Sequence, residues 1–100
     1  SVYAATKGAV VAFSRSLALE TAPHDVRVNC ICPGDVRTPL VERQLATDEA
    51  LTLQAMGSLS PLRRIAEPRE IAKAVAFLLS EDASFITAVA LPVDGGLTSW

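Results

Sequence analysis

The sequence predicts an α/β fold, the C-terminal portion of a doubly wound parallel sheet with two strands and three to four helices. Two short apolar segments, 26–32 and 88–93, are rich in β-branched residues. Each stops at a strong turn signal, the first at Pro33-Gly34 and the second at Asp94-Gly95-Gly96. The segments between them have apolar residues at helical spacing. A strand, a helical connection and a second strand imply a right-handed crossover and a parallel pair.

The first element is predicted to be a helix over residues 2–22. Its centre, residues 8–13, is apolar nearly all the way round, so this helix must be covered on more than one side. A sheet can cover one side, and we expect a partner subunit to cover another. Pro23 ends the helix, because proline disfavours helical geometry in the residue before it.

Three further helices are expected between the two strands. The first covers about 39–46, with Thr38 as its cap and a proline in its first turn. The second covers about 47–56, with Gly57 as its stop. The third covers about 68–79, where the apolar residues form a stripe at helical spacing.

These elements do not make a complete domain. Parallel strands are normally buried on both faces by helices, and two of them are not a stable sheet. We therefore expect residues 1–100 to be a C-terminal fragment of a single domain, with no second domain.

Composition limits the classes of partner. The chain has 9 basic and 11 acidic residues, a formal net charge of −2, which gives no reason to expect nucleic acid or an anionic membrane. No apolar run is long enough to span a bilayer, and no leader pattern is visible. Cys30 and Cys32 fall two apart on a strand, about 6.6 Å between Cα atoms, so buried free thiols in a cytoplasmic protein are expected. His24 is the only histidine, and no metal site is expected.

Tyr3 and Lys7 lie four residues apart at the start of the first predicted helix. That spacing stacks both side chains on one face, and a cation held beside a phenol favours the phenolate. The pair is therefore a plausible acid–base couple. Taken alone, the same spacing is more typical of a packed ring beside a solvated lysine.

Four motifs in order resemble one family. They are Tyr3-x-x-x-Lys7 at the head of a long helix; 27–34 (RVNCICPG) with Thr38; 61–72, with PLRR before EPREIA; and 91–96 (LPVDGG). Together they cover nearly the whole chain, which resembles the C-terminal part of a short-chain dehydrogenase/reductase, with a Rossmann-like sheet. The family's glycine-rich loop, its cofactor-selecting residue and its catalytic serine have no counterpart in these 100 residues.

The resemblance implies roles for particular residues. Tyr3 would exchange a proton with the substrate oxygen, while Lys7 would assist it and hydrogen-bond the nicotinamide ribose of NAD or NADP. Pro33 and Gly34 would let the backbone approach the nicotinamide. The backbone of Val36 and the hydroxyl of Thr38 would hold its carboxamide or a neighbouring phosphate. Asn29 would tie the strand end to the active-site loop, and Ala88 stands where the family often has glycine.

The expected activity of the parent chain is NAD(P)-dependent hydride transfer between nicotinamide and a carbonyl or secondary alcohol, with this piece inactive by itself. One alternative is a non-catalytic dinucleotide-binding or assembly protein on the same scaffold. Another is epimerisation or dehydration of nucleotide sugars, which the Pro33-Gly34 motif and the ending 93–96 disfavour. The resemblance also implies a homodimer or homotetramer, with the first helix and residues 39–56 as candidate contacts.

A substrate pocket is expected near Asp35, Val36 and residues 39–60. The side chains that could form an apolar wall, or equally pack the helices, are Leu40, Leu45, Leu51, Leu53 and Met56. Keto-acyl, steroid, sugar and small alcohol substrates all stay open.

Overall fold

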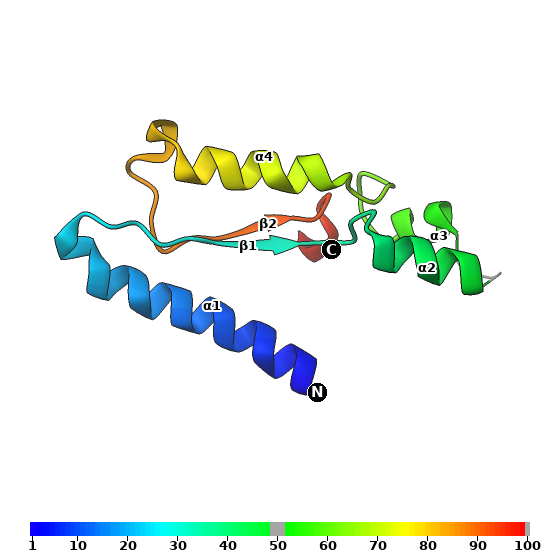
Figure 1. Ribbon diagram of the computed structural model, residues 1–100, viewed down its shortest axis with the longest axis horizontal. Coiled ribbons are helices and arrows are strands. Elements are labelled where there is room, and N and C mark those ends of the chain that lie inside the picture. The colour runs from blue at the N-terminus through cyan, green and yellow to red at the C-terminus, as the bar shows by residue number, and fades with distance from the viewer. Residues whose placement is uncertain (49–51, 100) are drawn as a thin grey trace. The chain divides into compact units, whose positions relative to one another are not determined.

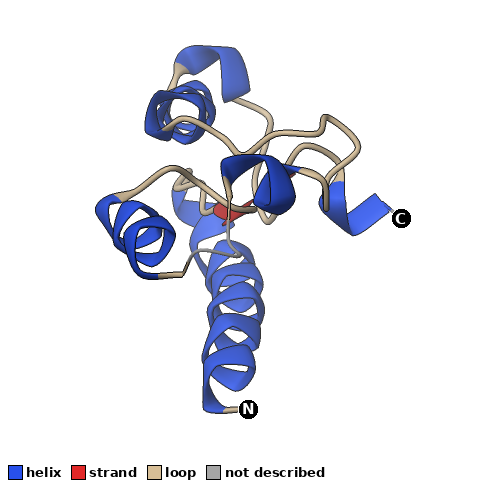
Figure 2. Ribbon diagram, turned by 90° about the vertical axis from the view of Figure 1, so that its right-hand side faces the viewer, coloured by secondary structure: helices blue, strands red, loops and turns tan. Residues whose placement is uncertain are grey.

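The computed structural model describes residues 1–48 and 52–99, which divide into two compact units. The first unit joins Ser1–Ile31 to Phe77–Leu91, and the second joins Cys32–Ala76 to Pro92–Trp100. Helices make up most of the described elements, and the strands are short (Figure 2).

Helix α1, Val2–Thr21, begins the first unit. The Ser1 hydroxyl caps it by accepting a hydrogen bond from the Ala4 N–H, as N-terminal serines commonly do. A 3₁₀ turn, Ala22–His24, ends it one residue earlier than predicted, with Pro23 in that turn. Ala18 is buried, whereas residues 1–10 are all exposed, so the described chain covers only the C-terminal half of this apolar helix.

The predicted parallel pair of strands is confirmed, with strand β1 at Cys30–Pro33 and strand β2 at Ala90–Val93 side by side (Figure 1). The Cys30 N–H donates to the Val89 carbonyl, and the Gly34 N–H donates to the Val93 carbonyl. Both bonds join residues 59 positions apart, the constant offset of a parallel register.

Both strands are shorter than predicted, because side chains and a left-handed residue replace the regular ladder at their start. The Asn29 amide donates to the Ile86 carbonyl and accepts from the Val89 N–H, each at 3.0 Å. Ala88 adopts φ 63°, a left-handed conformation that regular strands exclude. Asn29 therefore ties the start of β1 to residues 86–89, and the expectation that it ties the strand end to the active-site loop is wrong.

Arg27 fixes the C-terminal end of the last helix within the first unit. Its guanidinium donates to the carbonyls of Leu78 at 2.7 Å, Ile86 at 3.1 Å and Ser80 at 3.4 Å. The last carbonyls of a helix have no partner inside it, and a cation placed there also complements the helix dipole.

Two helices follow β1 in the second unit, α2 at Pro39–Thr47 and α3 at Leu53–Gly57. Thr38 caps α2 as predicted, with Pro39 in the first turn. The prediction of one helix over 47–56 is wrong: Thr52 is extended and caps α3, so that helix begins at Leu53. Glu49, the last residue of the predicted start at 47–49, and the wall residue Leu51 lie outside the described residues.

Helix α4 spans Pro68–Leu79, as predicted, and short 3₁₀ turns follow at Glu81–Ala83 and Leu97–Ser99. Ahead of α4, Val36 and Ala66 form an isolated parallel bridge, which joins the loop after β1 to the loop before α4. Arg64 pairs with Glu70 in the first turn of α4.

Cys30 and Cys32 form no disulfide with each other, and each is half-buried rather than buried. Among the described helices, none combines the length and the apolar character that crossing a membrane requires. Within 1–48 and 52–99, no three His, Cys, Asp or Glu side chains gather as metal ligands would.

Candidate active site

The structure brings Tyr3 and Lys7 together on the first turns of α1. The Lys7 ammonium lies over the Tyr3 ring, with Nζ 5.4 Å from the ring centroid. At this distance a cation is attracted to the face of an aromatic ring. Tyr3 is 72% exposed within the described part of the chain.

Gly34 is required by close packing and not by a turn. A Cβ on Gly34 would lie 2.9 Å from the Asp94 Cβ and 3.0 Å from the Asp94 Cα. These distances are shorter than real Cβ contacts, so a side chain at position 34 would push the two strand ends apart. Gly34 has no positive φ, and the motif Pro33-Gly34 closes β1 without reversing the chain.

The N–H and C=O groups of Val36 point away from Ala66. In the parallel bridge the Ala66 N–H donates to the Asp35 carbonyl at 2.9 Å, and the Arg37 N–H donates to the Ala66 carbonyl at 2.8 Å. Because successive peptide groups of an extended chain alternate in direction, the Val36 N–H and C=O point to the opposite side. That donor and acceptor are suited to a ligand's amide group.

The Thr38 hydroxyl accepts a long hydrogen bond of 3.4 Å from the Val41 N–H as the cap of α2. A hydroxyl that accepts still has its own proton to donate. Capping alone explains Thr38, but the same hydroxyl can also donate to a ligand.

The predicted site residues therefore form two groups. Tyr3 and Lys7 belong to the first unit, and the segment 33–38 belongs to the second.

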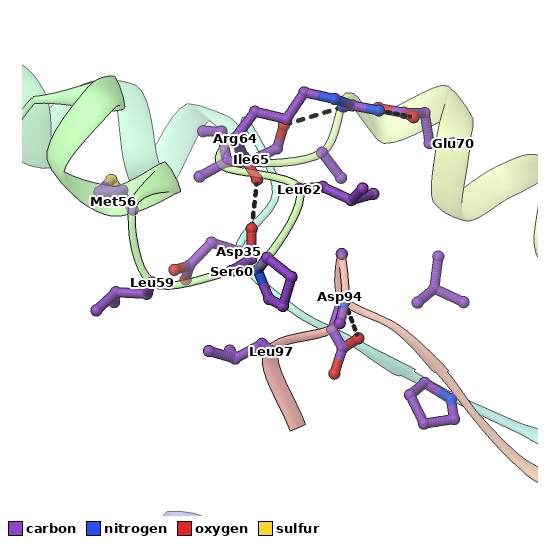
Figure 3. Close-up of a pocket in the computed structure, with 16 residues that line it drawn as sticks. Asp35, Met56, Leu59, Ser60, Leu62, Arg64, Ile65, Glu70, Asp94 and Leu97 are labelled. Carbon is purple, nitrogen blue, oxygen red and sulfur yellow. Dashed lines mark hydrogen bonds and ion pairs between the residues drawn. The ribbon is translucent and has the colours of Figure 1, made fainter. Parts of the chain in front are cut away.

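A cavity of about 500 Å³ lies in the second unit, within the size range of small-molecule pockets (Figure 3). It is built from Asp35 after β1, from the loop 56–66, from Glu70 on α4 and from residues 92–97 at the end of β2. The cavity therefore lies at the carboxyl ends of two parallel strands, where ligands of α/β proteins usually bind.

Sequence reasoning found part of this lining. Asp35 and Met56 line the cavity as expected, whereas Val36, Leu40, Leu45 and Leu53 are not among its described lining residues. Leu59 also lines it, within the expected range 39–60, and the apolar side chains that were missed are Leu62, Ile65 and Leu97. Only their apolar character marks them in the sequence, because they come from separate loops.

A family model described as Enoyl-(Acyl carrier protein) reductase matches residues 1–98. The chain belongs to the short-chain dehydrogenase/reductase family. The resemblance and the fold class inferred from the sequence are both confirmed, and the family is one of dinucleotide-dependent oxidoreductases.

Relatives within the short-chain dehydrogenase/reductase family show how much of the fold this chain represents. It is 46% identical over 96 residues to the short-chain dehydrogenase anuF of Penicillium roqueforti (strain FM164), covering 96% of this chain and 34% of that relative. A crystal structure of a short chain dehydrogenase family protein from Francisella tularensis is similar with a TM-score of 0.88 and 38% identity, over 98% of this chain and 43% of that one. ElxO with NADP bound gives a TM-score of 0.90 at 28% identity, over 98% and 39%. The chain thus spans about a third of the length of the curated relative.

Three charged residues that line the cavity of this short-chain dehydrogenase/reductase chain have hydrogen-bond partners: Arg64, Glu70 and Asp94. Arg64 donates to both carboxylate oxygens of Glu70, at 2.6 and 2.8 Å, and this pairing lowers the pKa of Glu70 to about 2. The pKa of Asp94 is lowered mainly by the hydrogen bond from the Thr98 hydroxyl, helped by the Gly96 N–H. Both carboxylates are therefore held as anions by the residues around them.

Proposed function

We propose that the full-length protein is an NAD(P)-dependent oxidoreductase that interconverts a carbonyl and a secondary alcohol, with residues 1–100 as the C-terminal portion of its single domain. The observation that carries this proposal is the Lys7 ammonium over the Tyr3 ring at the exposed start of α1. Because the chain spans about a third of its curated relative, we expect the 100 residues alone to be inactive.

Tyr3 is the proton donor to the carbonyl oxygen in the reducing direction, and it takes the proton back in the oxidising direction. Its exposure leaves the hydroxyl free to meet a substrate oxygen within hydrogen-bond reach. The Lys7 cation, which lies over the face of the Tyr3 ring, stabilises the phenolate left behind by electrostatic attraction. Lys7 also has hydrogen-bond donors to spare for ribose hydroxyls of the cofactor.

Four residues of the second unit fit a nicotinamide group. The Val36 N–H and C=O, turned away from Ala66, match the two polar atoms of a carboxamide, and the Thr38 hydroxyl has a proton to donate. Pro33 and Gly34 precede Val36 and Thr38 at the end of β1, and Gly34 has no side chain that would keep a ligand away from the backbone. When bound, NAD(P)H supplies the hydride to the carbonyl carbon, forming the C–H bond as Tyr3 supplies the O–H proton.

Exchange of Tyr3 for phenylalanine tests the proposal, because it removes one oxygen and keeps the ring under Lys7. In the full-length protein, Tyr3→Phe should lower kcat for carbonyl reduction about 10²–10⁴-fold, the usual contribution of a positioned acid. Lys7→Met should lower kcat as well. Lys73→Met on α4 is the matched control, since Lys73 is the only other lysine in the chain and is exposed.

Unchanged turnover in Tyr3→Phe would refute the acid–base role of Tyr3, whereas absence of turnover in the wild-type protein would favour the alternative, a non-catalytic dinucleotide-binding or assembly protein. That alternative predicts cofactor binding without carbonyl reduction by the wild-type protein. The two functions are therefore separated by one cofactor titration and one turnover assay.

We also propose a cytoplasmic homodimer or homotetramer. Exposed apolar side chains on α1, among them Val2 at 85%, Val10 at 50% and Phe13 at 66%, support an association surface. Light scattering of the full-length protein at micromolar concentration should give at least twice the monomer mass.

A further inference from the structure

The charges that line the cavity of the second unit differ in whether they have partners (Figure 3). Arg64 and Glu70 pair with each other through two short hydrogen bonds. Asp94 accepts hydrogen bonds from the Gly96 N–H at 3.0 Å and from the Thr98 N–H and hydroxyl at 3.1 and 2.8 Å. Asp35 is the remaining charged lining residue, and its carboxylate makes no hydrogen bond or ion pair with another described residue.

The backbone, in contrast, holds Asp35 firmly. Its carbonyl accepts from the Ala66 N–H at 2.9 Å, two residues after the end of β1. The Asp35 backbone is therefore held in place at the cavity wall, while its carboxylate makes no contact with another described residue that stabilises the fold.

The rest of the wall is largely apolar, with Met56, Leu59, Leu62, Ile65 and Leu97 among the lining side chains. A ligand that removes these groups from water gains free energy from burial of apolar surface. The Asp35 carboxylate would repel an anionic ligand, whereas it would attract a cationic one.

We propose that this cavity binds an apolar organic molecule with a cationic group, and that the Asp35 carboxylate selects the cation over an anion. The binding of this molecule does not depend on the proposed function. Only its identification as the substrate rests on the proposed function. That identification narrows the substrate class to apolar carbonyl compounds or alcohols with an amine or quaternary ammonium group, and it disfavours carboxylates of the same size.

Three probes of equal chain length test the proposal on the full-length protein: octyltrimethylammonium, octanoate and 1-octanol, each below the concentration at which it forms micelles. Met56 is the single methionine of these 100 residues and lines the cavity, so its methyl resonance reports binding there. Loss of one methyl signal in Met56→Leu assigns that resonance. We expect octyltrimethylammonium to bind about tenfold more tightly than octanoate, because the charge contact changes sign between them.

Asp35→Asn should reduce that preference to less than about threefold. Glu81→Gln, the same loss of one charge at an exposed residue outside the cavity lining, should leave it near tenfold. Equal affinities for the cation and the anion, a preference that survives Asp35→Asn, or no perturbation of the Met56 methyl by any probe would overturn the proposal.

These readouts separate this inference from the proposed function. Binding of the cation does not require turnover, so an inactive protein with the Asp35-dependent preference would refute only the oxidoreductase proposal. An enzyme that loses activity in Tyr3→Phe but binds all three probes alike would refute only the cavity inference.

Discussion

For the substitution Gly57→Ala, two physical effects predict changes of opposite sign in the free energy of unfolding. It is the last residue of α3, and helix propensity favours alanine over glycine by roughly 1 kcal/mol. A Cβ on Gly57, however, would lie 2.6 Å from the Arg64 Cα, 3.0 Å from the Arg64 N and 3.1 Å from the Arg63 carbonyl oxygen. These are backbone atoms, which cannot move aside as a flexible side chain could.

The clash should outweigh the propensity. Ordinary contact begins near 3.4 Å, so the loop 58–64 must move by most of an ångström. That movement strains the hydrogen bonds of Ser60, whose N–H donates to the Gly57 carbonyl at 3.2 Å and whose hydroxyl donates to the Arg64 carbonyl at 3.2 Å. Overpacking of this kind costs about 1–3 kcal/mol, and we expect Gly57→Ala to lower the free energy of unfolding by about 2 kcal/mol.

Gly8→Ala is the matched control, because it makes the same change inside helix α1. A Cβ on Gly8 would meet nothing within 4 Å in the described structure. Because α1 is also the proposed association surface, both variants are compared in the dissociated protein, where propensity should raise the stability of Gly8→Ala by about 0.5–1 kcal/mol. Urea unfolding of both variants at unchanged m-value measures the two shifts. Stability shifts of the same sign in both variants, or a stabilising Gly57→Ala, would show that the space beside each glycine does not determine the effect of substituting alanine.

Three further changes follow from the structure. Ala88→Gly should raise the free energy of unfolding by about 1 kcal/mol in a thermal melt, because position 88 has φ 63°. Arg27→Met should lower it by about 3 kcal/mol in urea, since the guanidinium donates to three carbonyls around the end of α4. For Glu70, the folded pKa of about 2 lies below the usual 4.5, so the stabilisation is complete above pH 4.5 and is lost as the pH falls towards 2. Glu70→Gln should therefore flatten the acid limb of stability in that window, and an unchanged limb would contradict the Arg64 pairing.

Helices with local signals were predictable from the sequence. α4 matches its predicted bounds because Pro68 marks its start and the apolar stripe fixes its face. The cap Thr38 placed α2 in the same way. α3 was misplaced because the segment 47–49 contains good capping residues, whereas the cap in use is Thr52.

Strand bounds were harder, because they depend on partners far away in the chain. Asn29 looks like part of a β-branched strand, but its amide bonds to Ile86 and Val89, nearly 60 residues later. The left-handed φ of Ala88 is also invisible locally, since alanine rarely adopts it.

The same distinction separates the two parts of the candidate site. Tyr3 and Lys7 are four residues apart on one helix, so their contact follows from helical geometry alone. The cavity combines Asp35, the loop 56–66 and residues 92–97, and no local pattern places these segments together. Its lining could be predicted only where it coincided with an expected loop.

Two motifs that look independent in the sequence explain each other in the structure. A Cβ on Gly34 would lie 2.9 Å from the Asp94 Cβ, so only glycine fits there, and the Gly34 N–H donates a hydrogen bond to the Val93 carbonyl. Asp94 is in turn held by the Gly96 N–H and the Thr98 hydroxyl. The ends of β1 and β2 thus lie side by side at the cavity, with Asp35 two residues after β1 and Asp94 directly after β2. Asp94 accepts three hydrogen bonds, whereas the Asp35 carboxylate accepts none from another described residue, so among the described lining carboxylates Asp35 is the one left to pair with a ligand.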